Sequence, residues 1–316
     1  MSYLYLIVYC VLVIGASLFG GELPARVRMT HSVVQKVLSG IAGLMLGVAL
    51  FHMLPHAAVE VDSLDIVMLW VMAGLLGTLL LIRLFHFHQH GPAEDGVPCV
   101  PHEHDHGQGH GQGHDHGQAH NHLHDRSSAS VPHGSVPGNH QISWVGIGLG
   151  LTIHSLLDGA AMAASIRADA HNAPESPWPP GLGIALAVFF HKPLDSMSIT
   201  ALMATSGRPR MQRSIVNGAY SLICPLGAAL FWMGTSSLGG GNQVVIGYAL
   251  AFFAGVFLCI SLYDLLPEVQ FHSHDRFWLS ALLLIGVTFA WSLRFFEGPN
   301  AHRRLGAPQQ QQPQGK

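Results

Sequence analysis

The chain has 316 residues, of which 49% are hydrophobic and 10% are charged, and its formal net charge is −3 with histidine counted as neutral. Soluble domains typically carry about 25% charged residues, so this composition excludes an ordinary soluble protein and indicates a polytopic membrane protein. The sequence has no cluster of basic residues typical of nucleic-acid binding, so no nucleic-acid partner is expected. The four cysteines form no Cys-x-x-Cys pair, which argues against a disulfide framework and a thiolate zinc site.

Eight apolar stretches are long enough to cross a bilayer as helices, which takes roughly 17 to 25 residues each. In chain order, the predicted spans are 3–20, 37–58, 63–85, 142–166, 181–205, 214–234, 243–266 and 277–296. We therefore predict an all-α polytopic membrane protein with transmembrane parts at 1–85 and 141–298 and a disordered tail at 299–316. No Lys or Arg precedes the first stretch, so we expect it to be retained rather than removed as a signal peptide.

The segment between the third and fourth spans, residues 86–140, is dominated by His, Gly, Gln, Pro and Asp. It cannot bury a core, so a long disordered cytosolic loop is predicted. Imidazoles bind zinc, copper and nickel, and a flexible chain rich in them would bind such ions at several weak sites. Low-affinity ligands are expected in this loop, among them His104, His106, His114 and His116. The loop is interpreted as a metal buffer or sensor, with an incidental polar linker as the alternative.

Lys and Arg residues predict the orientation of the chain, because they concentrate on the cytosolic side of membrane proteins. If the N-terminus is outside, the cytosolic connections carry most of them, including Arg26, Arg83, Arg208 and Arg276. We therefore expect both termini outside, in a multi-pass protein of the plasma (inner) membrane.

Two strings of histidine and aspartate lie in the middle of the fourth and fifth spans. They are His154-Ser-Leu-Leu-Asp158 and His191-Lys-Pro-Leu-Asp195. Residues four apart lie on the same helix face, and aspartate at the centre of a membrane helix costs about 3 kcal/mol unless it has a partner or a function. Two imidazoles and two carboxylates suit tetrahedral zinc and would leave the occupied site near neutral. We predict a mid-membrane metal site whose affinity weakens below roughly pH 6, where histidine is protonated.

Two further pairs flank this central site. The second span contains His52-Met-Leu-Pro-His56, and the seventh contains Asp264-Leu-Leu-Pro-Glu268. The strings look like related copies at opposite membrane faces, as an inverted repeat in a 3+2+3 arrangement produces. The predicted entrance consists of His52 and His56, and the predicted exit consists of Asp264, Glu268, His272 and His274. The alternatives are that the histidines are packing residues and that the acids cap a helix end.

These motifs resemble those of the ZIP (Zrt/Irt-like) family of divalent metal transporters. The family's fourth span carries H-[NS]-x-x-[DE]-G, which His154-Ser-Leu-Leu-Asp158-Gly matches closely, and its fifth span carries H-x-x-x-[ED], which His191 and Asp195 match. The resemblance implies eight spans, outside termini, a homodimer, and metal ligands at these four positions. It also implies net metal movement into the cytoplasm, most often of Zn²⁺, with Fe²⁺, Mn²⁺ or Cd²⁺ accepted by some members.

The chain departs from the family pattern at Lys192 and in the sixth span. Ser155 stands where many relatives have asparagine, and Lys192 stands where many have an acidic or amide residue that helps to hold a second metal. An ammonium group there would repel or replace a second dication, so we predict a single-metal central site tuned by these two residues. In the sixth span, where some relatives offer glutamate, Asn217 and Ser221 are the polar candidates.

Three other functions compete with a transporter of this kind. A zinc exporter of the cation diffusion facilitator type also uses His and Asp four residues apart, but it usually has six spans and a soluble C-terminal domain. An intramembrane zinc hydrolase would need a general base, commonly in H-E-x-x-H, which is absent here, although Asp158 or Asp195 could serve. A pure metal sensor would not need aspartates at the midplane. We therefore expect a transporter rather than an enzyme.

Overall fold

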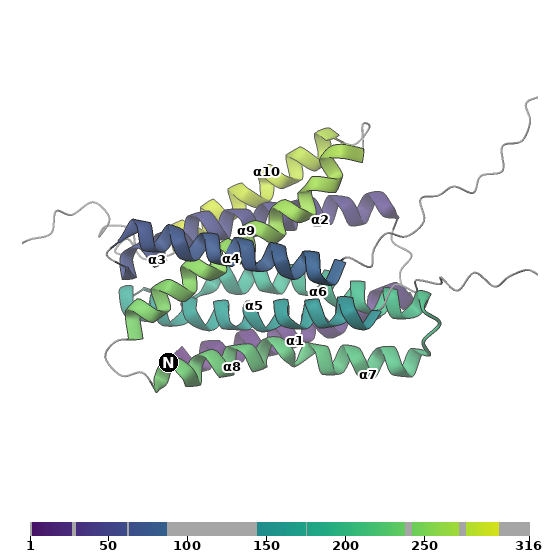
Figure 1. Cartoon of the computed structure of the whole chain (residues 1–316), viewed down its shortest axis with the longest axis horizontal. Coiled ribbons are helices and arrows are strands. Elements are labelled where there is room, and N and C mark those ends of the chain that lie inside the picture. Colours follow the sequence, from purple (N-terminus) through teal and green to yellow (C-terminus); the bar gives the residue numbers. More distant parts are fainter. Residues whose placement is uncertain are drawn as a thin grey trace, which may run out of the picture. The chain divides into compact units, whose positions relative to one another are not determined.

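The computed structural model describes residues 2–26, 30–61, 63–86, 144–174, 176–237, 242–271 and 276–296 (Figure 1). Within this part every regular element is a helix, as expected for apolar segments that must satisfy their backbone hydrogen bonds internally in a bilayer. The elements are α1 (Ser2–Arg26), α2 (His31–Val48), the π-helical turn η1 (Ala49–Met53), α3 (Leu54–Glu60), α4 (Leu64–His86), α5 (Trp144–Asn172), α6 (Leu182–Thr205), α7 (Arg210–Ser221), α8 (Ile223–Ser236), α9 (Asn242–Phe271), α10 (Arg276–Leu293) and the short η3 (Arg294–Phe296).

Six segments of the described chain are long and apolar enough to cross a membrane. They are Ser2–Pro24, Ser32–Glu60, Leu64–Leu84, Val145–Asn172, Arg210–Ser236 and Gln243–Tyr263. The two other predicted spans are also helical, but they are not both long and apolar enough to be counted with these six. The helix α6 carries the charged residues Lys192 and Asp195 near its middle, and the apolar part of α10 is the shorter segment Phe277–Leu293. The prediction of a helical membrane protein is confirmed, and the count of eight spans stays a prediction.

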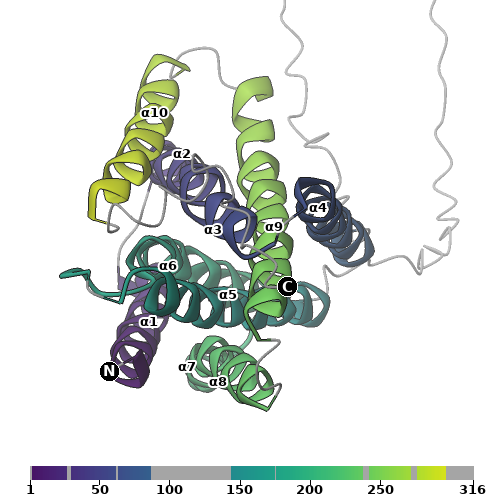
Figure 2. The same cartoon turned by 90° about the vertical axis from the view of Figure 1, so that its left-hand side faces the viewer.

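The helices pair closely, α2 with α10, α4 with α9, α5 with α8, and α1 with α6 (Figure 2). Figure 2 also shows two sets, which we call the α2 group (α2, η1, α3, α4, α9 and α10) and the α5 group (α1, α5, α6, α7 and α8). Glycines allow backbones to approach within pairs, as small residues do in membrane bundles. A Cβ at Gly43 would lie 2.2 Å from the carbonyl oxygen of Leu283, and one at Gly74 would lie 2.0 Å from that of Phe252.

Two predicted spans are broken next to proline. Pro55 has no N–H to donate to the carbonyl of Phe51, and the helix is wound as the π-turn η1 just before it. Pro225 likewise cannot donate to the carbonyl of Ser221, and the sixth predicted span divides there into α7 and α8. The first of these breaks contains His52, so proline sets the position of a residue predicted to be functional.

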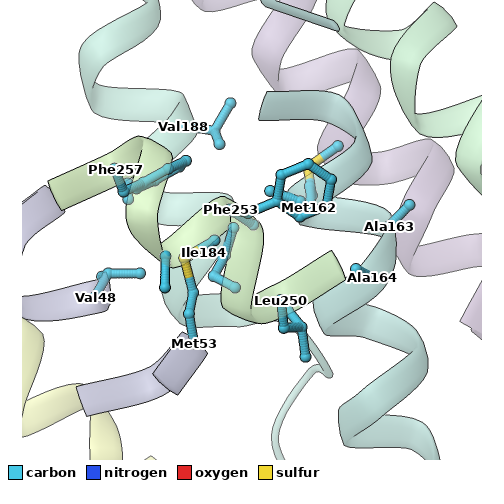
Figure 3. Packing of buried hydrophobic residues seen from close by; sticks show 14 of the residues in the cluster. Val48, Met53, Met162, Ala163, Ala164, Ile184, Val188, Leu250, Phe253 and Phe257 are labelled. Carbon is cyan, nitrogen blue, oxygen red and sulfur yellow. The ribbon is translucent and has the colours of Figure 1, made fainter. Parts of the chain in front are cut away.

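A layer of buried apolar side chains lies where the two groups meet (Figure 3). It includes Met53 of η1, Met162 of α5, Ile184 of α6, and Leu250 and Phe257 of α9, each no more than 1% exposed. We call the end of the bundle where α3 and α5 end and α6 begins the Gly181 end, and the opposite end the Thr205 end. The apolar layer separates the middle of α5 and α6 from the Gly181 end.

Candidate metal centre

The two central strings meet because α5 and α6 pack together and each presents a His and an Asp four residues apart. Asp158 Oδ2 lies 3.4 Å from His154 Nε2 and 3.2 Å from His191 Nε2. Asp195 Oδ2 lies 3.7 Å and 3.8 Å from the same two nitrogen atoms. Two ligand atoms of one tetrahedral zinc ion are about 3.3 Å apart, given bonds of about 2.0 Å. The four side chains therefore have the spacing of a metal site.

A hydrogen bond to the backbone fixes the orientation of the His191 ring. His191 Nδ1 is 2.7 Å from the carbonyl oxygen of Ala187, which can only accept, so Nδ1 carries the proton and donates. The lone pair of a neutral ring then lies on Nε2, which faces Asp158. Support of this kind selects the tautomer that binds metal and holds the ring in place. Among the described residues, no other group of three or more His, Cys, Asp or Glu side chains comes as close together as the central four.

The residual exposure of the site lies on its Thr205 side. The side chain of Asp158 is 0% exposed, whereas those of His154 and Asp195, which lie nearer the Thr205 end along their helices, are 11% and 14% exposed. From Ala161 to Ile166, on the other side, every residue of α5 is buried. The exposed fraction of the site therefore lies on its Thr205 side, and buried apolar residues lie on its other side.

The ammonium group of Lys192 lies inside the site rather than at its edge. Its Nζ donates to Asp158 Oδ2 at 2.9 Å and to Asp195 Oδ2 at 3.2 Å, and the side chain is 0% exposed. Lys192 therefore supplies a fixed positive charge that bridges the two carboxylates. This geometry supports the interpretation that lysine takes the place of a second metal.

Tyr220 of α7 is a member of the site that sequence reasoning missed. Its hydroxyl lies 3.4 Å from Asp195 Oδ2 and 3.4 Å from the carbonyl oxygen of Leu151, either of which can accept its proton. The ring centroid lies 5.3 Å from the Lys192 ammonium, within cation–π range. Tyr220 is one helical turn beyond Asn217 and shares its face, which is the signal that could have identified it.

The polar candidates predicted near this site have other roles. Asn217 Nδ2 donates to the carbonyl oxygen of Leu18 at 3.3 Å, and Ser221 Oγ donates to that of Gly218 at 2.7 Å. The first bond joins α7 to α1, the second lies within α7, and neither reaches the four central side chains. Ser155 is fully buried on α5, next to His154.

The two histidines predicted at the entrance have different partners. His52 Nε2 lies 2.8 Å from the carbonyl oxygen of Ala290, so it donates its proton there and links η1 to α10. His56 Nε2 instead lies 3.3 Å from Asp169 Oδ1 of α5. At the predicted exit, the backbone of Asp264 and Glu268 belongs to α9, and their side chains lie outside the described part. The remaining predicted ligands, His272, His274, His104, His106, His114 and His116, also lie outside it.

Removing the hydroxyl of Tyr220 tests its contribution. In a Tyr220→Phe variant the ring stays beneath Lys192 while Asp195 loses a long hydrogen bond, so the KM for zinc uptake should rise about 2- to 10-fold. The measurement is the initial uptake rate in proteoliposomes as a function of zinc concentration. The matched control is Tyr248→Phe on α9, whose ring stacks on Trp70. Equal KM values for the two variants would show that the Tyr220 hydroxyl does not contribute to the site.

The central geometry agrees with a comparison over nearly the whole chain. A family model described as "ZIP Zinc transporter" matches residues 3–291. The match includes α5 and α6, which supply the four clustered side chains, and the apolar helices suit a membrane protein. The family consists of transporters, not enzymes. The chain therefore belongs to the ZIP zinc transporter family, whose members carry divalent metal ions across membranes.

Proposed function

We propose that this protein moves zinc into the cytoplasm through a mid-membrane site formed by the central four side chains, His154, Asp158, His191 and Asp195. The observation that carries the proposal is the spacing of their ligand atoms, all of which lie within 4.8 Å of one another. Two nitrogen and two oxygen ligands favour zinc in tetrahedral coordination. Fe²⁺, Mn²⁺ and Cd²⁺ are the competing ions to compare in the same assay.

We also propose eight spans in a 3+2+3 inverted repeat, and the helix pairs support it. If spans one to three are related to spans six to eight, and span four to span five, then α2 corresponds to α9, and α10 to α4. The repeat then relates the contact between α2 and α10 to the contact between α9 and α4. It also relates the contact between α1 and α6 to the contact between α8 and α5. All four of these pairs are present in the structure.

The division into two helix groups supports a simple mechanism. All four ligand candidates, together with Lys192 and Tyr220, belong to the α5 group, so this group can rock against the α2 group without taking the site apart. With the Thr205 end in the cytosol, as the basic residues predict, the exposed side of the site faces inward. Zinc would leave past Asp264, Glu268, His272 and His274 toward the His-rich loop at 86–140, which we propose is disordered and modulatory. We further expect a homodimer in the plasma membrane.

The test is zinc entry into liposomes that contain the purified full-length protein and a zinc-sensitive dye. A His154→Ala/Asp195→Ala variant should lose uptake by about 100-fold or more, because two ligands of the site are removed. The matched control is His171→Ala/Asp65→Ala, which removes the same two residue types at exposed positions of α5 and α4. A deletion of residues 95–138 should keep uptake. If the double variant and its control move zinc equally, the assignment of the central site is wrong.

A further inference from the structure

A histidine and an aspartate, two residue types that bind metal ions, lie close together at the Gly181 end, away from the central four. His56 Nε2 of α3 is 3.3 Å from Asp169 Oδ1 of α5, the separation expected of two ligands on one tetrahedral zinc ion, about 3.3 Å. The two residues are 4% and 9% exposed. His56 belongs to the α2 group and Asp169 to the α5 group, so the pair bridges the two halves of the bundle.

Each member of this pair has a second polar residue one turn further along its own helix. Glu60 follows His56 by four residues and Asn172 follows Asp169 by three, so each lies on the same helix face as its partner. Asn172 Nδ2 donates to Glu60 Oε1 at 2.8 Å across the two helices. The arrangement of two helices that each present two polar side chains at helical spacing repeats the design of the central site.

The carboxylate of Asp169 is held in place by a backbone contact. It lies in the last turn of α5 and reaches the N-terminus of α6, where Gly181 is the N-cap residue and the helix dipole favours a negative charge. Its Oδ2 accepts the backbone N–H of Gly181 at 2.7 Å, which orients Oδ1 toward His56. Gly181 has φ of 74°, and a Cβ there would lie 2.6 Å from the side chain of Ile166. The local backbone therefore supports this orientation of the carboxylate.

The pair is aligned with the central site but separate from it. Asp169 follows Asp158 by 11 residues, which is close to three turns, so both lie on one face of α5 about 16 Å apart along its axis. Met162, a member of the apolar layer, lies between these two aspartates along α5, and it packs in one buried cluster with Ile184. An ion at the Gly181 end would therefore have to wait for the two helix groups to move before it reached the central site.

We propose that His56, Glu60 and Asp169 form a second divalent-cation site, which captures the ion on the side of the apolar layer opposite to the cytosol. Glu60 completes the site by turning from Asn172 toward the ion, and Asn172 then faces it as an oxygen donor. His52 is not part of this site, because its Nε2 proton is donated to the carbonyl oxygen of Ala290 on α10. This inference rests on the proposed function for its direction of transport.

The experiment is zinc uptake by proteoliposomes containing the full chain, with KM and maximal rate measured separately. Asp169→Asn should raise the KM about tenfold and change the maximal rate less than about twofold. The reason is that the substitution weakens the first binding of the ion at the Gly181 end and leaves the central site unchanged. Asp169→His should keep the KM within about threefold of wild type, because two imidazoles can share a zinc ion although they cannot form an ion pair. The matched control is Asp65→Asn, which removes an exposed carboxylate of the first turn of α4 at the same end.

An unchanged KM in Asp169→Asn, or equal defects in the asparagine and histidine variants, would overturn the proposal, and the latter result would identify the pair as a structural latch. If Asp169→Asn does not fold, His56→Gln gives the same comparison from the other helix. Failure of the proposed function is a different result, since wild type itself would then move no zinc, or the His154→Ala/Asp195→Ala variant would move it normally.

Discussion

Replacing Lys192 with methionine is expected to destabilise the metal-free protein by about 3–5 kcal/mol, the usual effect of removing one partner from a buried ion pair. The ammonium donates to both Asp158 and Asp195, and without it two carboxylates face each other in a buried site. Zinc should then stabilise the variant more than it stabilises wild type, because the dication supplies the missing positive charge. The measurement is thermal unfolding of the purified protein in detergent, with a chelator and with zinc.

The control for this experiment is Lys36→Met, which removes a lysine from α2, outside the site. The difference in bound zinc between wild type and His154→Ala/Asp195→Ala also tests the prediction of a single central ion, and it should be one ion per chain. A Lys192→Met protein as stable as wild type in chelator would mean that the ammonium does not hold the carboxylates. A difference of two ions would contradict the single-metal site.

Substituting Gly159 with alanine is the second change for which we expect a large effect. A Cβ at this position would lie 1.9 Å from the carbonyl oxygen of Cys224 and 2.7 Å from the backbone nitrogen of Ala228. Both atoms belong to the backbone of α8, so α5 and α8 must move apart. Overpacking of this kind typically costs about 1–3 kcal/mol, and the adjacent ligand Asp158 moves with the helix. We expect lower unfolding temperature and loss of most zinc uptake.

The same helix provides the matched control. A Cβ at Gly148 would meet no neighbouring segment of the described chain within 4 Å. Gly148→Ala should therefore be neutral or should stabilise α5 by up to about 1 kcal/mol through helix propensity. Unfolding temperature and uptake of both variants would be measured side by side. If the two substitutions have the same small effect, the close approach of α5 to α8 is not required for a working site.

The central site can be predicted from the sequence because its information is local. His154 and Asp158, like His191 and Asp195, are four residues apart on one helix, and helical spacing alone puts each pair on one face. The place of Lys192 beside the carboxylates likewise follows from its sequence neighbours, since it lies three residues before Asp195 on the same helix.

What could not be predicted depends on contacts between helices distant in sequence. Tyr220 reaches Asp195 from another helix, and its place on the same helix face as Asn217 does not say which other helix that face contacts. Asp169 lies 113 residues beyond His56, and no spacing rule connects them. The bond of His52 to Ala290 likewise requires the packing of α10 against the π-turn.

The lysine inside the central site has a consequence for the return step of transport. Two aspartates without a counter-ion would give the vacant site a charge of −2 in a low-dielectric bundle, and the tethered ammonium reduces this to −1. The vacant protein can therefore reorient with less charge to move through the membrane, and a single proton would make that step neutral. Under the proposed function, Lys192 would act as a built-in counter-ion for the two carboxylates when the protein returns without zinc.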